Sequence, residues 1–250
     1  MSGPAKSELG GNEMLRPRQG FIIAIDGPVA SGKGTVAAAL AEKLGGFFMN
    51  TGGMYRAVAL YCINSEIDIN NEAEVKRILP EINVDIRGGK ILLNSDDVTE
   101  RITEVDTSRG SSVVAVYGSV RKALVAKQQE IGQRFITQNQ IVIAEGRDIG
   151  TAVFPNARFR MYLTASVEVR AKRRQAQEEA SGKHRDLTEI IEDLEIRDKR
   201  DKGRALSPLS SDPGKDGYWV LDNSEQNSEQ TIEVIAEKLK EEGLIEDDQN

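Results

Sequence analysis

The apolar positions of the chain gather in short runs separated by longer amphipathic stretches. The apolar-rich runs cover residues 22–25, 47–50, 140–144, 159–163 and 219–222. Such runs are typical of strands that are buried on both faces, as in a parallel sheet. The stretches between them are long enough to form helices. The pattern therefore predicts a three-layer α/β fold around a central parallel sheet.

The amphipathic stretches predict six helices, over residues 33–44, 54–60, 112–135, 167–179, 187–202 and 228–241. The stretch 112–135 reads as one continuous helix because one side of it is apolar. That side carries Val113, Val116, Val120, Leu124 and Ile131. The stretch 187–202 instead mixes both signs of charge, which is usual for a solvated face with i,i+4 ion pairs.

A small lobe is predicted to interrupt the alternation of strands and helices. Residues 83–87 and 90–94 alternate between polar and apolar and are joined by Gly88 and Gly89, which is a hairpin signal. Residues 97–99 add a third short strand. We therefore expect a single domain over residues 20–241, with a core made of 20–67, 109–165 and 205–241. An insert over 68–108 carries a small antiparallel sheet, and a helical lid covers 166–204. Residues 1–19 are expected to be a disordered extension and 242–250 an acidic tail.

Composition limits the classes of function. The net charge of −7 argues against a broad nucleic-acid-binding surface. His184 is the only histidine, which argues against histidine acid–base catalysis and multi-histidine metal sites. The single cysteine, Cys62, fits a reducing compartment, and the first twenty residues lack the apolar region of a secretory signal. We expect a cytoplasmic monomer without a membrane or nucleic-acid partner.

The loop that follows the first apolar run has the spacing G-x-x-x-x-G-K of a P-loop. An ordinary strand-to-helix turn would also contain glycine, but here an apolar strand precedes the loop and a helix-forming run follows it. Glycines allow the backbone N–H groups to approach phosphate oxygens. Lys33 is expected to reach the β- and γ-phosphates of ATP, and the hydroxyl of Thr35 to lie beside Mg²⁺. The predicted ATP-binding residues are Gly27, Pro28, Val29, Ala30, Ser31, Gly32, Lys33, Gly34 and Thr35.

Arginines follow several of the predicted strands or lie in the lid. Arginine donates in pairs to phosphate oxygens and keeps its charge, so these residues suit phosphoryl transfer. The candidates are Arg56, Arg147, Arg173, Arg197 and Arg204. Arg56 could also be a solvated helix residue, and Arg147 could simply pair with Asp148. A phosphate acceptor needs no general base, whereas a hydroxyl acceptor would need a carboxylate such as Asp148, so the residues alone leave both acceptors open.

Four segments resemble the bacterial-type cytidylate kinase family of nucleoside monophosphate kinases. They are residues 25–35, 51–56, 145–155 and 197–209, and they include G-R-D-I-G-T and R-D-x-R-D-x-x-R. The resemblance implies the reaction of ATP and CMP to ADP and CDP, with dCMP also accepted and UMP a poor substrate. This chain has Thr51 and Glu145 where the family often has serine and aspartate, and both changes keep the functional group.

The resemblance also implies roles for individual residues. Ser112, Arg121 and Asp148 would read the cytosine edge. Thr51, Arg56 and Arg147 would hold the monophosphate, and Arg197 and Asp201 the ribose hydroxyls. Arg173 and Arg204 would close around the phosphates, so that the implied catalytic set is Lys33, Arg147, Arg173 and Arg204.

Two other classes of protein remain as alternatives. One is a P-loop kinase acting on AMP or UMP, although such kinases lack the combination of G-R-D-I-G-T with an inserted hairpin. The other is a nucleotide-binding switch protein. A GTPase of that class would carry an N-K-x-D-type segment, which this sequence lacks.

Overall fold

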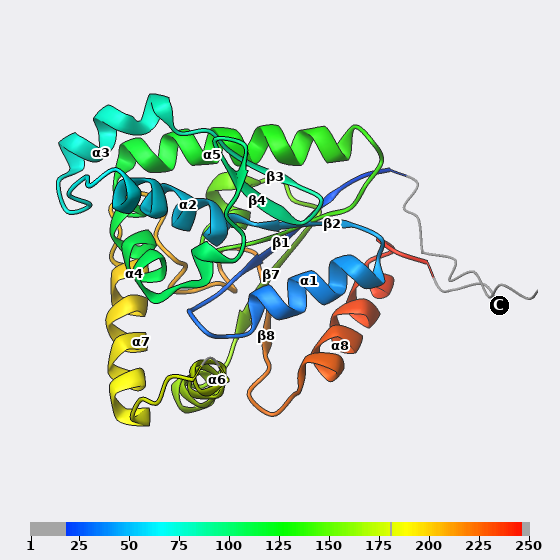
Figure 1. Ribbon diagram of the computed structural model, residues 1–250. Coiled ribbons are helices and arrows are strands. Elements are labelled where there is room, and N and C mark those ends of the chain that lie inside the picture. The colour runs from blue at the N-terminus through cyan, green and yellow to red at the C-terminus, as the bar shows by residue number, and fades with distance from the viewer. Residues whose placement is uncertain (1–18, 181, 247–250) are drawn as a thin grey trace, which may run out of the picture.

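A five-stranded parallel sheet, in the order β2-β6-β1-β7-β8, forms the centre of the molecule (Figure 1). The computed structural model describes residues 19–180 and 182–246. The strands are β1 Ile22–Asp26, β2 Phe47–Asn50, β6 Val142–Glu145, β7 Phe159–Thr164 and β8 Trp219–Asp222. The predicted parallel sheet is confirmed. The predicted extension lies almost wholly outside the described residues, as does the end of the acidic tail.

Helices cover both faces of this sheet. Successive side chains of a strand point to opposite faces. Ile22 and Ala24 of β1 accordingly join the hydrophobic cluster under helices α2 (Thr51–Asn64) and α5 (Gly118–Ile136), whereas Ile23 and Ile25 join the cluster under α1 (Lys33–Lys43) and α8 (Ser228–Glu241). The helices are α1 Lys33–Lys43, α2 Thr51–Asn64, α3 Glu72–Ile78, α4 Val105–Val114, α5 Gly118–Ile136, α6 Val167–Glu179, α7 Leu187–Lys202 and α8 Ser228–Glu241. The three-layer α/β prediction is therefore confirmed.

The predicted small sheet is present in the middle of the chain. It consists of β3 Val84–Arg87, β4 Lys90–Leu93 and β5 Asp96–Asp97, all antiparallel. The third strand is shorter than predicted and lies slightly earlier. Asp85 of β3 accepts a hydrogen bond at 3.1 Å from Arg134 of α5, which fastens the small sheet to the main body. The predicted end of the insert, residue 108, falls inside α4.

The prediction of one helix over 112–135 is wrong. The chain forms α4 and α5 instead, separated by a turn in which Val116 and Tyr117 donate to the carbonyls of Val113 and Val114. The hydroxyl of Tyr117 donates to the carbonyl of Ile69 at 3.0 Å, a contact that draws the turn toward the insert. Val116 is consequently 40% exposed and does not share a buried face with Val120. The apolar spacing continues through residues 115–117, although the helix is interrupted there. The contact between Tyr117 and Ile69, which are far apart in the sequence, stabilises this interruption.

The lid helices α6 and α7 have the predicted bounds. They pack through Ala171, Ile190 and Leu194, and this small cluster also contacts Val29 of the glycine-rich loop. Figure 1 shows the pair at the edge of the molecule, with α7 below α4 and α6 near one end of strand β7. From residue 19 to residue 246, residue 181 apart, no helix has the length and hydropathy needed to cross a bilayer.

Candidate functional site

The glycine-rich loop connects β1 to the start of α1. Gly27 packs so closely against β7 that a Cβ atom there would lie 2.1 Å from the carbonyl oxygen of Leu163. Gly32 precedes α1 with φ of 91°, in the left-handed region that favours glycine. These two glycines therefore allow the loop to curl tightly above the sheet, with the N-terminus of α1 at its end.

Lys33 is buried at the start of α1. Its Nζ atom donates to the carbonyl of Pro28 at 2.5 Å and to the hydroxyl of Ser31 at 3.2 Å. Burial, together with the nearby charge of Arg147, lowers the pKa of Lys33 to about 7. The amine is thus held across the loop in a setting where an added negative charge would favour its protonated form.

Thr35 is exposed in the first turn of α1 and lines two adjoining cavities beside the glycine-rich loop. A threonine hydroxyl is a suitable oxygen ligand for Mg²⁺, which is usually held by one or two protein groups together with substrate phosphates. Within residues 19–246, residue 181 excluded, no group of three or more histidine, cysteine, aspartate or glutamate side chains could hold a metal by itself. The donors present therefore fit a Mg²⁺ ion that arrives with a nucleotide.

Five arginines line a cavity of about 300 Å³ beside the loop. They are Arg56 from α2, Arg147 from the segment after β6, Arg174 from α6, Arg197 from α7 and Arg204 from the segment after α7. Burial and the charges of Arg147 and other neighbouring arginines lower the pKa of Arg197 to about 10, and burial also lowers the pKa of Arg56. Cations gathered in one buried place repel each other, so the cavity favours an anion with several charges.

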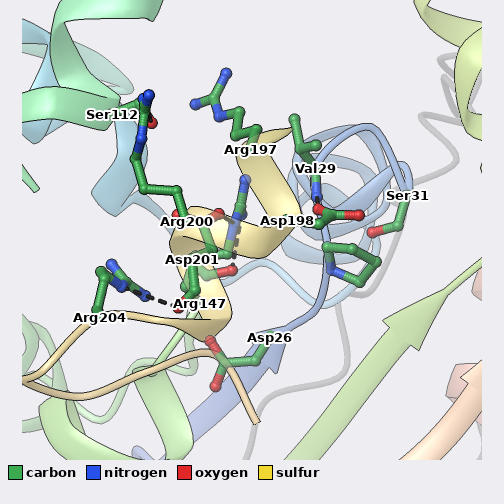
Figure 2. A network of polar contacts seen from close by, with 12 residues as sticks. Asp26, Val29, Ser31, Ser112, Arg147, Arg197, Asp198, Arg200, Asp201 and Arg204 are labelled. Atoms are coloured by element: carbon green, nitrogen blue, oxygen red, sulfur yellow. Dashed lines mark hydrogen bonds and ion pairs between the residues drawn. The ribbon is translucent and has the colours of Figure 1, made fainter. Parts of the chain in front are cut away.

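Arg147 is oriented by Asp201 of α7. Its Nε atom donates to the Asp201 carboxylate at 2.8 Å, and its Nη1 atom donates to the carbonyl of Gly146 (Figure 2). Burial opposes the charge of Arg147, but Asp201 and Glu145 outweigh it and raise its pKa. Arg147 and Asp148 do not pair with each other, because each finds a different partner.

Asp148 forms a buried ion pair with Arg121 of α5. The Nη1 atom of Arg121 and the Nη2 atom of Arg204 are also buried, and neither finds a hydrogen-bond partner within the described part of the chain. Unpaired buried donors are uncommon in folded proteins. These two donors give this end of the site unused hydrogen-bonding capacity for a polar ligand.

Ser112 stands at the wall of the cavity, on α4. Its hydroxyl accepts a hydrogen bond at 2.9 Å from Arg200 of α7, and Figure 2 shows the long Arg200 side chain reaching across to it. Arg197 reaches the neighbouring Ser108 at 3.4 Å. The lid therefore lies against α4 in this conformation. Thr51 is buried at the start of α2, where its hydroxyl donates to the carbonyl of Glu145 at 2.7 Å.

Arg173 does not line the cavity shared by the five arginines. Its guanidinium donates to the carbonyls of Ser31 and Gln226 and to both oxygens of Asn223. It borders a second cavity, of about 420 Å³, which shares Gly32, Thr35 and Arg174 with the first. Arg204 lies beyond the end of α7, in the segment that follows the helix.

Several residues of the site were not singled out from the sequence. Arg174 is one of these residues. It lies four residues after Arg170 and therefore on the same face of the predicted helix over 167–179. Asp26 accepts hydrogen bonds from the backbone N–H groups of Ile149 and Gly150 and from the hydroxyl of Tyr218. The sequence signal for Asp26 is an acidic residue directly after the apolar run 22–25, at the end of a strand predicted to be buried. Asp198 contacts the glycine-rich loop. It is a fixed position of the R-D-x-R-D-x-x-R segment, but no role was assigned to it from the sequence.

Known proteins resemble this chain along most of its length. A family model described as cytidylate kinase matches residues 23–241. A cytidylate kinase of Aster yellows witches'-broom phytoplasma is 39% identical, with 86% of this chain and 94% of the relative covered. One from Pasteurella multocida is also 39% identical, with 88% and 93% covered.

A solved structure adds to the comparison of the fold alone. An uncharacterized protein from Eubacterium ventriosum superposes with a TM-score of 0.50 at 12% identity, covering 88% of this chain and 98% of that one. The family match spans the glycine-rich loop, the insert, the converging arginines and the lid. The chain therefore belongs to the cytidylate kinase family.

Proposed function

We propose that this chain transfers the γ-phosphate of ATP to CMP, and also to dCMP, in the cavity that the five arginines line. The observation that carries the proposal is this cluster beside Lys33, made of Arg56, Arg147, Arg174, Arg197 and Arg204. Transfer between two phosphates brings many negative oxygens together, and the protein's main task is to position them and neutralise their charge. An acceptor phosphate is already ionised at neutral pH, so the reaction requires no general base.

ATP is proposed to bind along the glycine-rich loop, residues 27–35. The loop amides and the N-terminus of α1 favour anions, and Lys33 lies where it can follow the transferred phosphate. When bound with the nucleotide, Mg²⁺ would neutralise phosphate charge, and Thr35 is the residue proposed to hold it. Arg173 is proposed to support the loop from the ATP side through its contact with the Ser31 carbonyl.

CMP is proposed to occupy the other end of the cavity. Arg56, Arg147 and Arg197 would bind its phosphate, with Thr51 at the start of α2 nearby. Two buried donor atoms, Nη1 of Arg121 and Nη2 of Arg204, have no hydrogen-bond partner among the described residues, which supports a polar base or ribose at this end. Ser112, Arg121 and Asp148 are proposed to read the cytosine edge, and Asp201 the ribose together with Arg197. A cytoplasmic location and a monomeric state stay predictions.

An ADP-release assay with ATP and Mg²⁺ tests the proposal. CMP, dCMP, UMP, AMP and GMP are supplied separately, and we expect strong turnover with CMP and dCMP only. Turnover led by UMP or AMP would keep the kinase but overturn the assignment of the base-reading residues. Tight ATP binding without turnover of any nucleotide would instead favour a nucleotide-binding switch protein.

A variant links the assay to the site. Asp148→Ala should reduce kcat/KM for CMP by about tenfold or more, because it removes an acceptor and leaves Arg121 unpaired. Its KM for ATP should change much less. Equal losses for both substrates would contradict the proposed role of Asp148.

A further inference from the structure

The lid helix α7 is attached directly to the glycine-rich loop by Asp198. One carboxylate oxygen, Oδ1, accepts a hydrogen bond from the backbone N–H of Val29 at 3.2 Å (Figure 2). The other, Oδ2, accepts one from the Nη1 atom of Arg170 at 2.7 Å. The Val29 amide was expected to face the phosphates of ATP, but in this structure it is directed to the lid.

Arg170 completes the contact from the second lid helix, α6. Its Nη1 atom also donates to the Val29 carbonyl at 3.0 Å, and its Nε atom donates to the carbonyl of Ala165 at 3.1 Å. Both peptide groups on either side of Val29 are therefore held by lid side chains. The Asp198 and Arg170 side chains are 14% and 9% exposed, so solvent screens the pair only in part.

The position of Asp198 on α7 connects this contact to the arginine cluster. Arg197 is the adjacent residue, and Asp201, which orients Arg147, lies three residues further along. A shift of the Val29 peptide would thus move the segment of α7 that carries Arg197. Asp198 therefore connects the glycine-rich loop to the part of α7 that borders the acceptor side of the cavity.

We propose that Asp198 is a positioning residue that couples nucleotide binding at the glycine-rich loop to the placement of Arg197 on the acceptor phosphate. It touches no substrate itself and acts through Val29 and Arg170. The inference rests on the proposed function, since it assumes that ATP and CMP bind on the two sides of this contact. Coupling of this kind is a free energy between two sites and must appear equally in the affinities of both ligands.

The test measures that coupling in the full-length protein. The Kd of CMP is determined by calorimetry with and without a saturating non-hydrolysable ATP analogue and Mg²⁺. We expect the analogue to tighten CMP binding by about fivefold or more in the parent protein, which is the lower end of typical coupling. In Asp198→Ala the ratio should fall to about one, because both carboxylate contacts are lost, while the Kd of CMP alone should stay close to that of the parent.

Two further variants separate positioning from general damage. Asp198→Asn keeps an oxygen for the Val29 N–H and loses the charge pair with Arg170, so its coupling should be intermediate. It also provides a measurement if Asp198→Ala does not fold. Asp193→Asn is the matched control. Asp193 lies on the same helix, and its carboxylate pairs with Arg185 at 2.7 Å instead of with the glycine-rich loop. Its coupling should equal that of the parent protein.

The possible results bear on the role of Asp198 as follows. Unchanged coupling in a folded Asp198→Ala or Asp198→Asn variant would overturn the inference and leave the proposed function intact. A parent protein that binds both ligands without coupling would do the same. Failure of the parent protein to bind CMP at all would overturn the proposed function and the inference with it.

Discussion

The guanidinium of Arg147 and the carboxylate of Asp201 lie 2.8 Å apart, although 54 positions separate them along the chain. Arg147 follows β6 in the sheet, and Asp201 lies in the last turn of the lid helix α7. Burial alone would raise the pKa of Asp201, but Arg147 and Arg204 outweigh it and lower that pKa. The pair therefore stays ionised and fixes one arginine of the cluster against the lid.

Asp201→Asn should lower kcat/KM for CMP by about tenfold or more. The amide holds Arg147 less firmly, and small displacements of a positioning group have large effects on transfer. Steady-state kinetics with varied CMP measure the loss. Asp212→Asn is the control, because its 2.6 Å pair with Lys215 is exposed and remote from the cluster. Equal rates in the two variants would contradict the role of Asp201.

Binding of ATP should be accompanied by uptake of about one proton at pH 8. The pKa of Lys33 in the free protein is about 7, so most of its amine is neutral at pH 8, and bound phosphates would restore the charge. The affinity for ATP should accordingly decline as the pH rises from 7 to 9. Calorimetry in two buffers of different ionisation enthalpy measures the uptake. Lys33→Met should abolish it, and persistence of the uptake in that variant would assign the proton to another group.

The ion pair of Arg121 with Asp148 should matter to stability in a non-additive way. Both side chains are almost fully buried, at 4% and 7% exposure. Arg121→Met alone leaves an uncompensated buried carboxylate and should cost about 3–5 kcal/mol of unfolding free energy. The double variant Arg121→Met, Asp148→Leu should recover much of that loss. Urea unfolding of the two single variants and the double variant measures the coupling, and simple additivity would contradict a strong pair.

Asp26 should make the folded state less stable as the pH rises from about 4 to about 6. Burial is the largest influence and raises the pKa of Asp26 from 3.8 to about 6, so the native state binds more protons than the unfolded chain in that window. The stabilising contribution is fully present below pH 4 and is lost as the carboxylate ionises. A shift of two pKa units corresponds to about 3 kcal/mol.

The comparison with Asp26→Asn isolates this contribution from other carboxylates. The unfolding free energy of the parent protein, relative to the variant, should decline between pH 4 and pH 6 and then level off. Chemical unfolding at several pH values measures the difference. A difference that stays constant, or that grows with pH, would show that Asp26 does not titrate in this way.

The five strands of the central sheet, the glycine-rich loop and the bounds of α6, α7, β8 and α8 could be predicted from the sequence. Their signals are local, because the spacing of apolar residues and the identity of turn residues depend on neighbours a few positions away. Arg56, Arg147 and Arg197 could be placed near one cavity for a similar reason. Each follows a strand or lies on a helix near the carboxyl edge of the sheet, where parallel sheets bind ligands.

Which charged residues pair, and which face the cavity, was decided by the tertiary structure. Arg174 and not its neighbour Arg173 joins the cluster, Asp198 holds the Val29 amide, and Asp148 chooses Arg121 over Arg147. The break between α4 and α5 likewise accompanies the contact of Tyr117 with Ile69, 48 positions away. These pairings depend on distances between segments that come together only when the chain folds. The spacing of residues within one segment therefore does not predict them.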